Sequence, residues 1–177
     1  MAEAPEISAP LSLPPRVADV RDLLLEQLGK LLTVEETLVK LVLPELTSAI
    51  GDSALKETVE SHLGETGDHV GNLKRAFLTL SEVPAGRPAE GFDGLRAEHA
   101  RAAEQVDPGL RDGIHCAAAM GTEHYEINAY EAAIRSADAL GAGEVGRLLR
   151  ANLDQEVEAL GRLGAHADRL AQQASSG

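Results

Sequence analysis

Apolar side chains recur at intervals of three and four residues along four long stretches of the sequence. This interval places them on one face of an α-helix, where they can pack against other helices. In the first stretch the apolar face consists of Leu25, Leu28, Leu32, Val39, Leu43, Leu46 and Ile50. The pattern predicts four helices, over residues 16–50, 53–82, 109–140 and 144–173. Pro44 is expected to bend the first helix, because proline lacks an N–H and crowds the carbonyl four residues back.

The connections between the predicted helices differ in length. Gly51 is followed directly by Asp52 and Ser53, and Gly141 begins a Gly-Ala-Gly break, so the first and third connections are tight turns. The second connection begins at residue 83, is rich in proline and glycine, and is expected to contain a short helix over residues 93–105. Two antiparallel hairpins joined by one long crossover form the ferritin-like type of all-α four-helix bundle.

An internal repeat supports this arrangement. A shift of 90 residues superposes the two hairpins without a gap. The positions that then coincide are Glu36 with Glu126, Gly51 with Gly141, Leu63 with Leu153 and Leu73 with Leu163. The coincidence of both turn glycines and of a glutamate indicates a bundle with approximate twofold symmetry.

Composition agrees with a single helical domain. The 177 residues suffice for one core, and 44% of them are hydrophobic but only 2% aromatic, whereas strands favour aromatic and β-branched residues. We expect a disordered leader over residues 1–15, which lacks the basic segment of a signal peptide. The bundle is expected over residues 16–173, and a frayed tail over residues 174–177.

The net charge of −13 narrows the range of partners. Such an acidic surface repels nucleic-acid phosphates and anionic membranes, and it attracts cations. No apolar run reaches the roughly 18 residues of a membrane span. The lone Cys116 cannot form an intrachain disulfide, which is usual in a reducing compartment. We therefore expect a cytoplasmic protein that binds neither nucleic acid nor membranes.

Two glutamates interrupt the apolar faces. Glu36 lies among the leucines of the first helix, and Glu156 lies among those of the fourth. An ionised carboxylate in a dry core costs several kcal/mol unless a cation accompanies it. The other two helices add acids and histidines about one turn apart. These are His62, Glu65 and His69 in the second helix and Glu123 and Glu126 in the third.

If the four helices pack with their apolar faces inward, one glutamate from each meets the others midway along the bundle. These glutamates are Glu36, Glu65, Glu126 and Glu156. Because several like charges cannot share an apolar space without counter-ions, we predict a pair of metal ions there. Bridging glutamates and histidine nitrogens suit Fe, Mn or Zn. The helical period leaves one choice open, since Glu35 could replace Glu36 as the inward residue.

The third helix contains the most distinctive segment, Glu-His-Tyr-Glu-Ile-Asn-Ala-Tyr over residues 123–130. It resembles the E-H-Y-E-I-x-x-Y motif of the YciE/YciF-type ferritin-like proteins of bacteria. Supporting segments are Glu36 with Leu43-Pro44, residues 62–66, Gly94-Leu95 with Glu98, and Leu153 with Glu156. The resemblance covers residues 20–170, which is nearly the whole chain.

The resemblance implies a ferritin-like bundle with an extra helix in the crossover, a homodimer, a role linked to stress and a di-iron site. The ligands that it carries over by position are Glu36, Glu65, Glu123, Glu126 and Glu156. The fourth helix departs from the family pattern, because Gln155 and Leu160 stand where the family tends to have acids. The chain also lacks the Glu-x-x-His segment of typical ferritins and rubrerythrins.

Two functional hypotheses follow. The first is a di-iron carboxylate centre that handles iron or reactive oxygen, with an activity like that of a peroxidase or ferroxidase. Its expected ligands are Glu36, Glu65, His69, Glu123, Glu126 and Glu156. Tyr130, His62 and Gln155 are expected behind them, as hydrogen-bond partners of the ligands. The second hypothesis is a metal-free stress protein that acts by dimerisation or by binding a protein partner.

Overall fold

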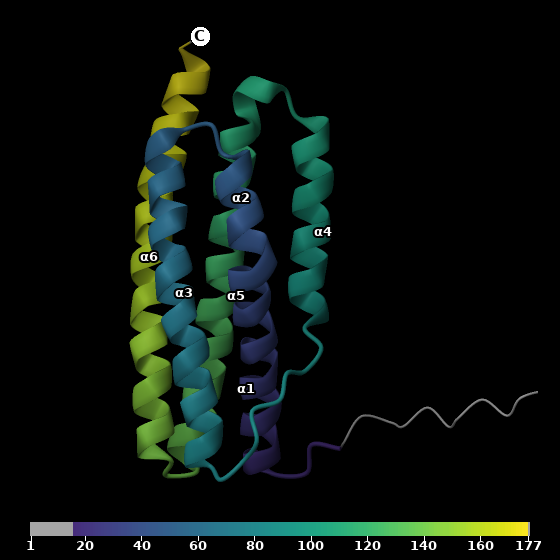
Figure 1. Ribbon diagram of the computed structural model, residues 1–177, viewed down its shortest axis with the longest axis vertical. Helices are drawn as coiled ribbons and strands as arrows, with labels where there is room; N and C mark the ends of the chain where they lie inside the picture. The colour runs from purple at the N-terminus through teal and green to yellow at the C-terminus, as the bar shows by residue number, and fades with distance from the viewer. Residues whose placement is uncertain (1–15, 177) are drawn as a thin grey trace, which may run out of the picture.

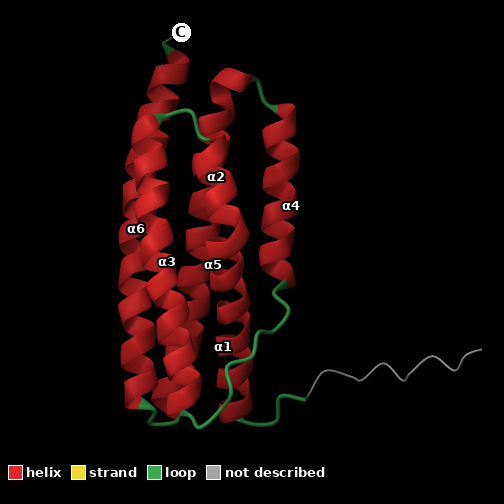
Figure 2. Ribbon diagram, in the orientation of Figure 1, coloured by secondary structure: helices red, strands yellow, loops and turns green. Residues whose placement is uncertain are grey.

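The structure, a computed structural model, describes residues 16–176, which fold into helices without a strand (Figures 1 and 2). The first half of the chain forms α1 (Val20–Thr37), a π-helical turn η1 (Leu38–Val42), α2 (Leu43–Ala49) and α3 (Ser53–Thr79). The second half forms α4 (Glu90–Gln105), a 3-10 turn η2 (Pro108–Leu110), α5 (Arg111–Ala139) and α6 (Gly143–Ser175). The leader expected over residues 1–15 lies outside the described residues.

Four long helical rods form the bundle, and each runs antiparallel to both of its neighbours (Figure 1). The rod that begins with α1 packs against α3 and α5, and α6 packs against the same two helices. The crossover helix α4 lies outside this square, against α5 (Figure 1). The predicted ferritin-like, all-α arrangement of two hairpins joined by a long crossover with an extra helix is therefore confirmed.

Polar side chains and one glycine fix the ends of the helices. Asp52 caps α3, because its side chain accepts a hydrogen bond from the Leu55 N–H at 2.8 Å. Asp112, near the start of α5, accepts hydrogen bonds from the N–H groups of Gly51 and Asp52 at 3.0 and 2.8 Å. Gly141 follows α5 with a φ of 67°, a conformation that strains other residues. The two hairpins are thus tied together at the α2–α3 turn.

The crossover passes close to α1 at Gly29. The Arg87 N–H donates a hydrogen bond to the Gly29 carbonyl at 2.9 Å. A Cβ atom at Gly29 would lie 2.9 Å from the carbonyl oxygen of Ala85, which is too close for a carbon–oxygen contact. Glycine therefore lets the crossover lie directly on α1 before the chain enters α4.

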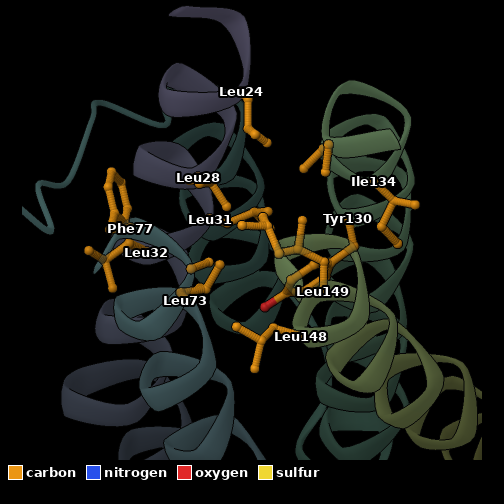
Figure 3. Close-up of a cluster of buried hydrophobic side chains, with 14 residues drawn as sticks. Leu24, Leu28, Leu31, Leu32, Leu73, Phe77, Tyr130, Ile134, Leu148 and Leu149 are labelled. Carbon is orange, nitrogen blue, oxygen red and sulfur yellow. The ribbon is translucent and has the colours of Figure 1, made fainter. Parts of the chain in front are cut away.

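The apolar core consists of two clusters with a polar layer between them. Figure 3 shows the first cluster, in which side chains from α1, α3, α5 and α6 point toward one another. It includes Leu24, Leu28, Leu31, Leu73, Phe77, Tyr130 and Leu149. The second cluster, toward the α2–α3 turn, includes Val34, Leu38, Leu43, Leu55, Phe92, Cys116 and Leu163. No helix within residues 16–176 is both long and apolar enough to cross a lipid bilayer.

Candidate metal centre

In the layer between the two apolar clusters, each rod of the bundle turns polar side chains inward. They are Glu35 from α1, His62, Thr66 and His69 from α3, Glu123 and Glu126 from α5, and Asn152 and Glu156 from α6. Every one is buried, and the most exposed of them, His62, is only 5% accessible. Four carboxylates and two imidazoles therefore share one interior space.

The candidate ligand atoms form two groups that share Glu156. One group contains Glu35 and His69, the other contains His62 and Glu123, and the atoms of each lie within 4.8 Å of one another. His69 Nδ1 lies 2.9 Å from Glu156 Oε1. His62 Nε2 lies 3.6 Å from Glu156 Oε2. Each oxygen of Glu156 thus faces a different histidine, which is the arrangement of a carboxylate that bridges two ions.

Unlike Glu35, Glu123 and Glu156, Glu126 pairs with neither histidine of the layer. Its side chain is fully buried, and neither carboxylate oxygen has a hydrogen-bond partner. Burial raises the pKa of Glu126 well above its usual range, and the neighbouring carboxylates of Glu35 and Glu156 raise it further. Buried polar groups in folded proteins are nearly always paired, so a carboxylate without a partner here indicates a ligand for a cation.

Each histidine is oriented by a hydrogen bond on its outer side. The Nε2–H of His69 donates to the amide oxygen of Gln155 at 2.8 Å, so Nδ1 faces the interior. The Nδ1–H of His62 donates to Glu65 at 3.1 Å, so Nε2 faces the interior. Glu65 is held in turn by Arg162 at 2.7 Å. Histidines that bind metals are commonly fixed in this way, with the second ring nitrogen bonded to an oxygen.

A hydrogen bond from Tyr130 orients Glu35 in the same way. The buried hydroxyl of Tyr130 donates a hydrogen bond to Glu35 Oε1 and accepts one from the Asn152 amide at 3.0 Å. Glu35 Oε2 has no hydrogen-bond partner. The contact therefore fixes the orientation of the carboxylate while leaving one of its oxygens for another ligand.

The pKa values show how the layer distributes its protons in the absence of metal. Burial raises the pKa of Glu35 to about 7, although His69 opposes the shift. Burial alone would lower the pKa of His69, but its contacts with Glu156 and Glu35 outweigh burial and raise it to about 10. Burial and the charge of Glu156 raise the pKa of Glu123 well above its usual range. Burial also acts on Glu156, yet His69 holds its pKa below the usual range. The shifts therefore favour a protonated His69 that pairs with Glu156, and they favour the protonated forms of Glu35, Glu123 and Glu126.

The prediction that Glu36 points into the bundle is wrong, and Glu35 takes its place. The Glu36 side chain is 30% exposed and forms ion pairs with Lys40 and Lys74, both at 2.8 Å. These two ammonium groups lower the pKa of Glu36. Glu36 therefore lies on the surface, one residue away from the buried acid.

The π-helical turn η1 explains this error of one residue. The Leu43 N–H bonds to the Leu38 carbonyl, five residues back, so the turn holds one residue more than an α-helical turn. Leu38 and Leu43 are both buried, at a spacing of five. Counting back from Leu43 in steps of three and four reaches Glu36, whereas counting back from Leu38 reaches Glu35. A prediction that assumes one regular α-helical period along the whole helix cannot detect the additional residue of the π-helical turn.

The structure places Glu65 behind the candidate ligands and His62 among them, which is the reverse of the prediction. Glu65 was expected among the inward acids, but its side chain is 23% exposed and lies at the rim, bonded to Arg162. His62 was expected behind the ligands, but it reaches the interior and lies 3.3 Å from Glu123. The inward face of α3 consists of His62, Thr66 and His69, and Glu65 precedes Thr66 by one position.

The remaining predicted residues lie at the layer. His69, Glu123, Glu126 and Glu156 are inside it, and Tyr130 and Gln155 bond to its members. Sequence inspection missed Asn152, which bonds to Tyr130. Its place on the inward face of α6, one turn before Glu156, was the available signal. Whether metal occupies the layer remains a prediction.

The fold and this buried set of carboxylates and imidazoles define a ferritin-like four-helix bundle with a candidate metal site. The chain belongs to the family described as domain of unknown function DUF892, which matches residues 19–176. It is 26% identical to protein YciF of Escherichia coli K12 over 139 residues, which is 77% of this chain and 83% of YciF. The resemblance to the YciE/YciF type is therefore confirmed.

Solved structures share the fold. YcfI from Rhodopseudomonas palustris is 32% identical, with a TM-score of 0.80 over 84% of this chain and 94% of that one. The stress protein YciF of E. coli is 24% identical, with a TM-score of 0.80 over 88% of this chain and 99% of that one. A protein from Xanthomonas campestris is 20% identical, with a TM-score of 0.70 over 89% and 97% of the two chains. The likeness extends over nearly the full length of each of these chains.

Proposed function

We propose that this protein binds two transition-metal ions in the buried layer and uses them to oxidise Fe(II) with dioxygen or hydrogen peroxide. The observation that carries the proposal is the buried carboxylate of Glu126, whose two oxygens have no partner. It lies in a layer where the two oxygens of Glu156 face two different histidines. Such a donor set suits a pair of ions rather than one.

The charges of the layer also support two bound ions. The four buried carboxylates carry a charge of −4 when ionised, and the two histidines are neutral when they bind metal. Two divalent ions supply the matching charge of +4, which leaves the interior neutral. A neutral centre avoids the cost of uncompensated charge in an apolar core.

The donors suit iron and manganese alike, and the proposed oxidation uses iron. Carboxylate oxygens with one imidazole per ion are the ligands of the di-iron and di-manganese proteins built on this bundle. Two bound ferrous ions would supply one electron each to an oxidant. The chain would hold the ligands in place through Gln155, Glu65 and Tyr130, and the surrounding leucines would exclude bulk water.

Metal analysis of the purified protein tests the proposal. After removal of metal with a chelator and anaerobic addition of Fe(II), gel-filtered protein should retain about two ions per chain. Glu126→Gln should lower the retained iron at least severalfold while leaving the helix content, measured by circular dichroism, unchanged. The matched control is Glu131→Gln on the same helix, because Glu131 is exposed and pairs only with Arg135.

The same experiment distinguishes the proposal from the metal-free alternative. Retention below about 0.2 ions per chain, with Fe(II), Mn(II) and Zn(II) alike, would show that the layer is not a metal site. The hypothesis of a helical protein that acts through a partner would then stand. Equal retention by the Glu126→Gln variant and the unmodified protein would show that metal binds elsewhere on the acidic surface.

A further inference from the structure

A chain of small cavities connects the surface beside α4 with the buried layer. The outermost has a volume of about 230 Å³ and lies beside Arg96, His99 and His115. The middle cavity, of about 40 Å³, lies between α4, η1 and α5 and has Glu123 in its wall. The innermost, of about 10 Å³, is lined by Glu123 and by His62. Neighbouring cavities therefore lead from the solvent to one half of the candidate centre.

Shared walls show that these cavities adjoin. The outermost and middle cavities share Val42, Leu46, Arg96 and His99. The middle and innermost cavities share Leu43, Leu46, Ala119 and Glu123. Glu123 lies where the last two cavities meet, and one of its carboxylate oxygens has no hydrogen-bond partner. A molecule that entered beside His99 would therefore meet this carboxylate first.

The size and polarity of the middle cavity limit what can pass. Its 40 Å³ exceeds the roughly 10–15 Å³ needed for one water-sized molecule. Most of its wall is aliphatic, from Leu38, Val42, Leu95 and Ala118 among others. Aliphatic walls cannot replace the hydration shell of a cation. The passage thus suits a small uncharged molecule of low polarity.

We propose that this passage delivers dioxygen to the Glu123 side of the metal pair. The inference rests on the proposed function, because dioxygen is the less polar of the two oxidants named there. Two ferrous ions would give up one electron each, and dioxygen would take both together with two protons and leave as hydrogen peroxide. Metal ions would reach the layer by another path, because the apolar walls of the middle cavity disfavour their passage.

Two small residues of α5 line the inner part of the passage. Ala118 forms part of the wall of the middle cavity, and Ala119 lies at its junction with the innermost one. Both are on α5, opposite Leu38 and Val42 of the π-helical turn. A larger side chain at position 118 would fill the middle cavity without replacing any of the six candidate ligands.

Xenon binding tests the passage independently of metal. Crystals of the unmodified protein under xenon pressure should show xenon in the middle cavity, beside Ala118 and Glu123. Ala118→Leu should abolish this xenon peak. Ala151→Leu, at an exposed position on α6, should keep it. Absence of xenon from the middle cavity of the unmodified protein would overturn the proposal, whether or not the protein binds iron.

Oxidation kinetics provide the second test. Ala118→Leu should slow the oxidation of the Fe(II)-loaded protein by dioxygen by about an order of magnitude. Anaerobic Fe(II) retention should stay at the unmodified level, and Ala151→Leu should change neither quantity. Oxidation of Ala118→Leu at the unmodified rate would overturn the proposal. If the unmodified protein does not retain iron, the proposed function is wrong. The xenon experiment then tests the passage by itself.

Discussion

Glu35 and Glu36 are adjacent in the sequence but occupy opposite environments. Glu35 is fully buried beside His69 and Tyr130. Glu36 lies at the surface between two lysines. The pKa of Glu35 is raised to about 7, whereas that of Glu36 is lowered. Two successive glutamates of α1 therefore have pKa values that are shifted in opposite directions, because one is buried and the other pairs with lysines.

This pair offers a test at single-residue resolution. Glu35→Gln should reduce Fe(II) affinity at least tenfold, because it removes one ionisable ligand, an effect of about 1.4 kcal/mol or more. Glu36→Gln should leave the affinity unchanged, because Glu36 lies outside the layer and forms its ion pairs with two surface lysines. Calorimetric titration with Fe(II) under anaerobic conditions measures both. A larger loss for Glu36→Gln would mean that α1 is rotated relative to the structure described here.

Gln155 allows a test of the hydrogen bonds behind the ligands. Gln155→Leu should weaken metal binding about 10- to 100-fold, because His69 would lose the acceptor that fixes its orientation. Gln155→Glu keeps an acceptor oxygen at this position and should retain the affinity. Competition with a coloured chelator measures the affinity of both variants. If the two variants behave alike, the bond between His69 and residue 155 does not support the site.

Some residues of the candidate site could not be assigned from the sequence alone, because the sequence does not show which of two nearby side chains points inward. The inward position of Glu156 was predictable, because it interrupts an apolar face with a regular period. Glu126 was predicted from its spacing of one turn to Glu123 and from the family motif over residues 123–130. Glu65 and His62 lie three positions apart on α3, so both fit the same broad face, and only packing decides that His62 points inward. Asn152 was missed because a single asparagine in a helix carries no strong signal.

At the scale of helices, the π-helical turn before Pro44 is the main departure from the predicted pattern. Proline cannot donate the backbone hydrogen bond of a continuous α-helix, and its ring crowds the preceding turn. The structure places the wide turn η1 directly before α2, where Pro44 occupies an early position that needs no such bond. The expected disturbance therefore takes the form of one additional residue in the rod.

Paired deletions test the role of this turn. Deleting Lys40 together with Pro44→Ala changes the spacing of Leu38 and Leu43 from five to four, which an ordinary α-helix accommodates. This variant should fold with a melting temperature within a few degrees of Pro44→Ala alone, and it should keep its metal affinity. Deleting Lys30 together with Pro44→Ala would rotate part of α1 by about 100° and expose core leucines, at a cost of about 3 kcal/mol or more. Thermal denaturation compares the two deletions, and equal destabilisation would contradict this account of the turn.

The hairpins and the crossover were predictable because their signals are local. Gly141, with a positive φ, and the cap of α3 at Asp52 mark chain reversals directly in the sequence. The position of α4 was not predictable in the same way. Only Phe92 of this helix is fully buried, so its sequence does not show which face of the bundle it covers.

At the scale of the whole molecule, the buried acids make the stability of the metal-free protein depend on pH. The pKa of Glu35 is raised from 4.5 to about 7, so the folded state binds a proton that the unfolded state lacks between these values. Glu123 and Glu126 are shifted in the same direction. The pKa of His69 is raised from 6.5 to about 10, which also favours the protonated folded state. All four groups therefore add stability as the pH falls.

The free energy of unfolding of the metal-free protein should increase by at least about 3 kcal/mol as the pH falls from about 7.5 to about 5. At still lower pH it should decrease, because the pKa values of Glu156 and Asp52 are lowered in the folded state. Urea denaturation in the presence of a chelator measures the profile. A stability that is constant or falls over the upper range would contradict the clustering of buried acids. Metal-loaded protein should show the opposite trend, because protons compete with metal for the same ligands.

The π-helical turn also changes how the two halves of the chain correspond. Gly51 and Gly141 are 90 positions apart (141 − 51), but the buried acids Glu35 and Glu126 are 91 apart (126 − 35). The stretch from the buried acid to the turn glycine is thus one residue longer in the first half of the chain. The π-helical turn η1 accommodates this additional residue without rotating the rest of the helical rod. An alignment of the halves that allows no gap pairs Glu126 with a surface residue. Placing a single gap inside residues 38–42 restores the match, so a bulge in one helix preserves the symmetry of the interior.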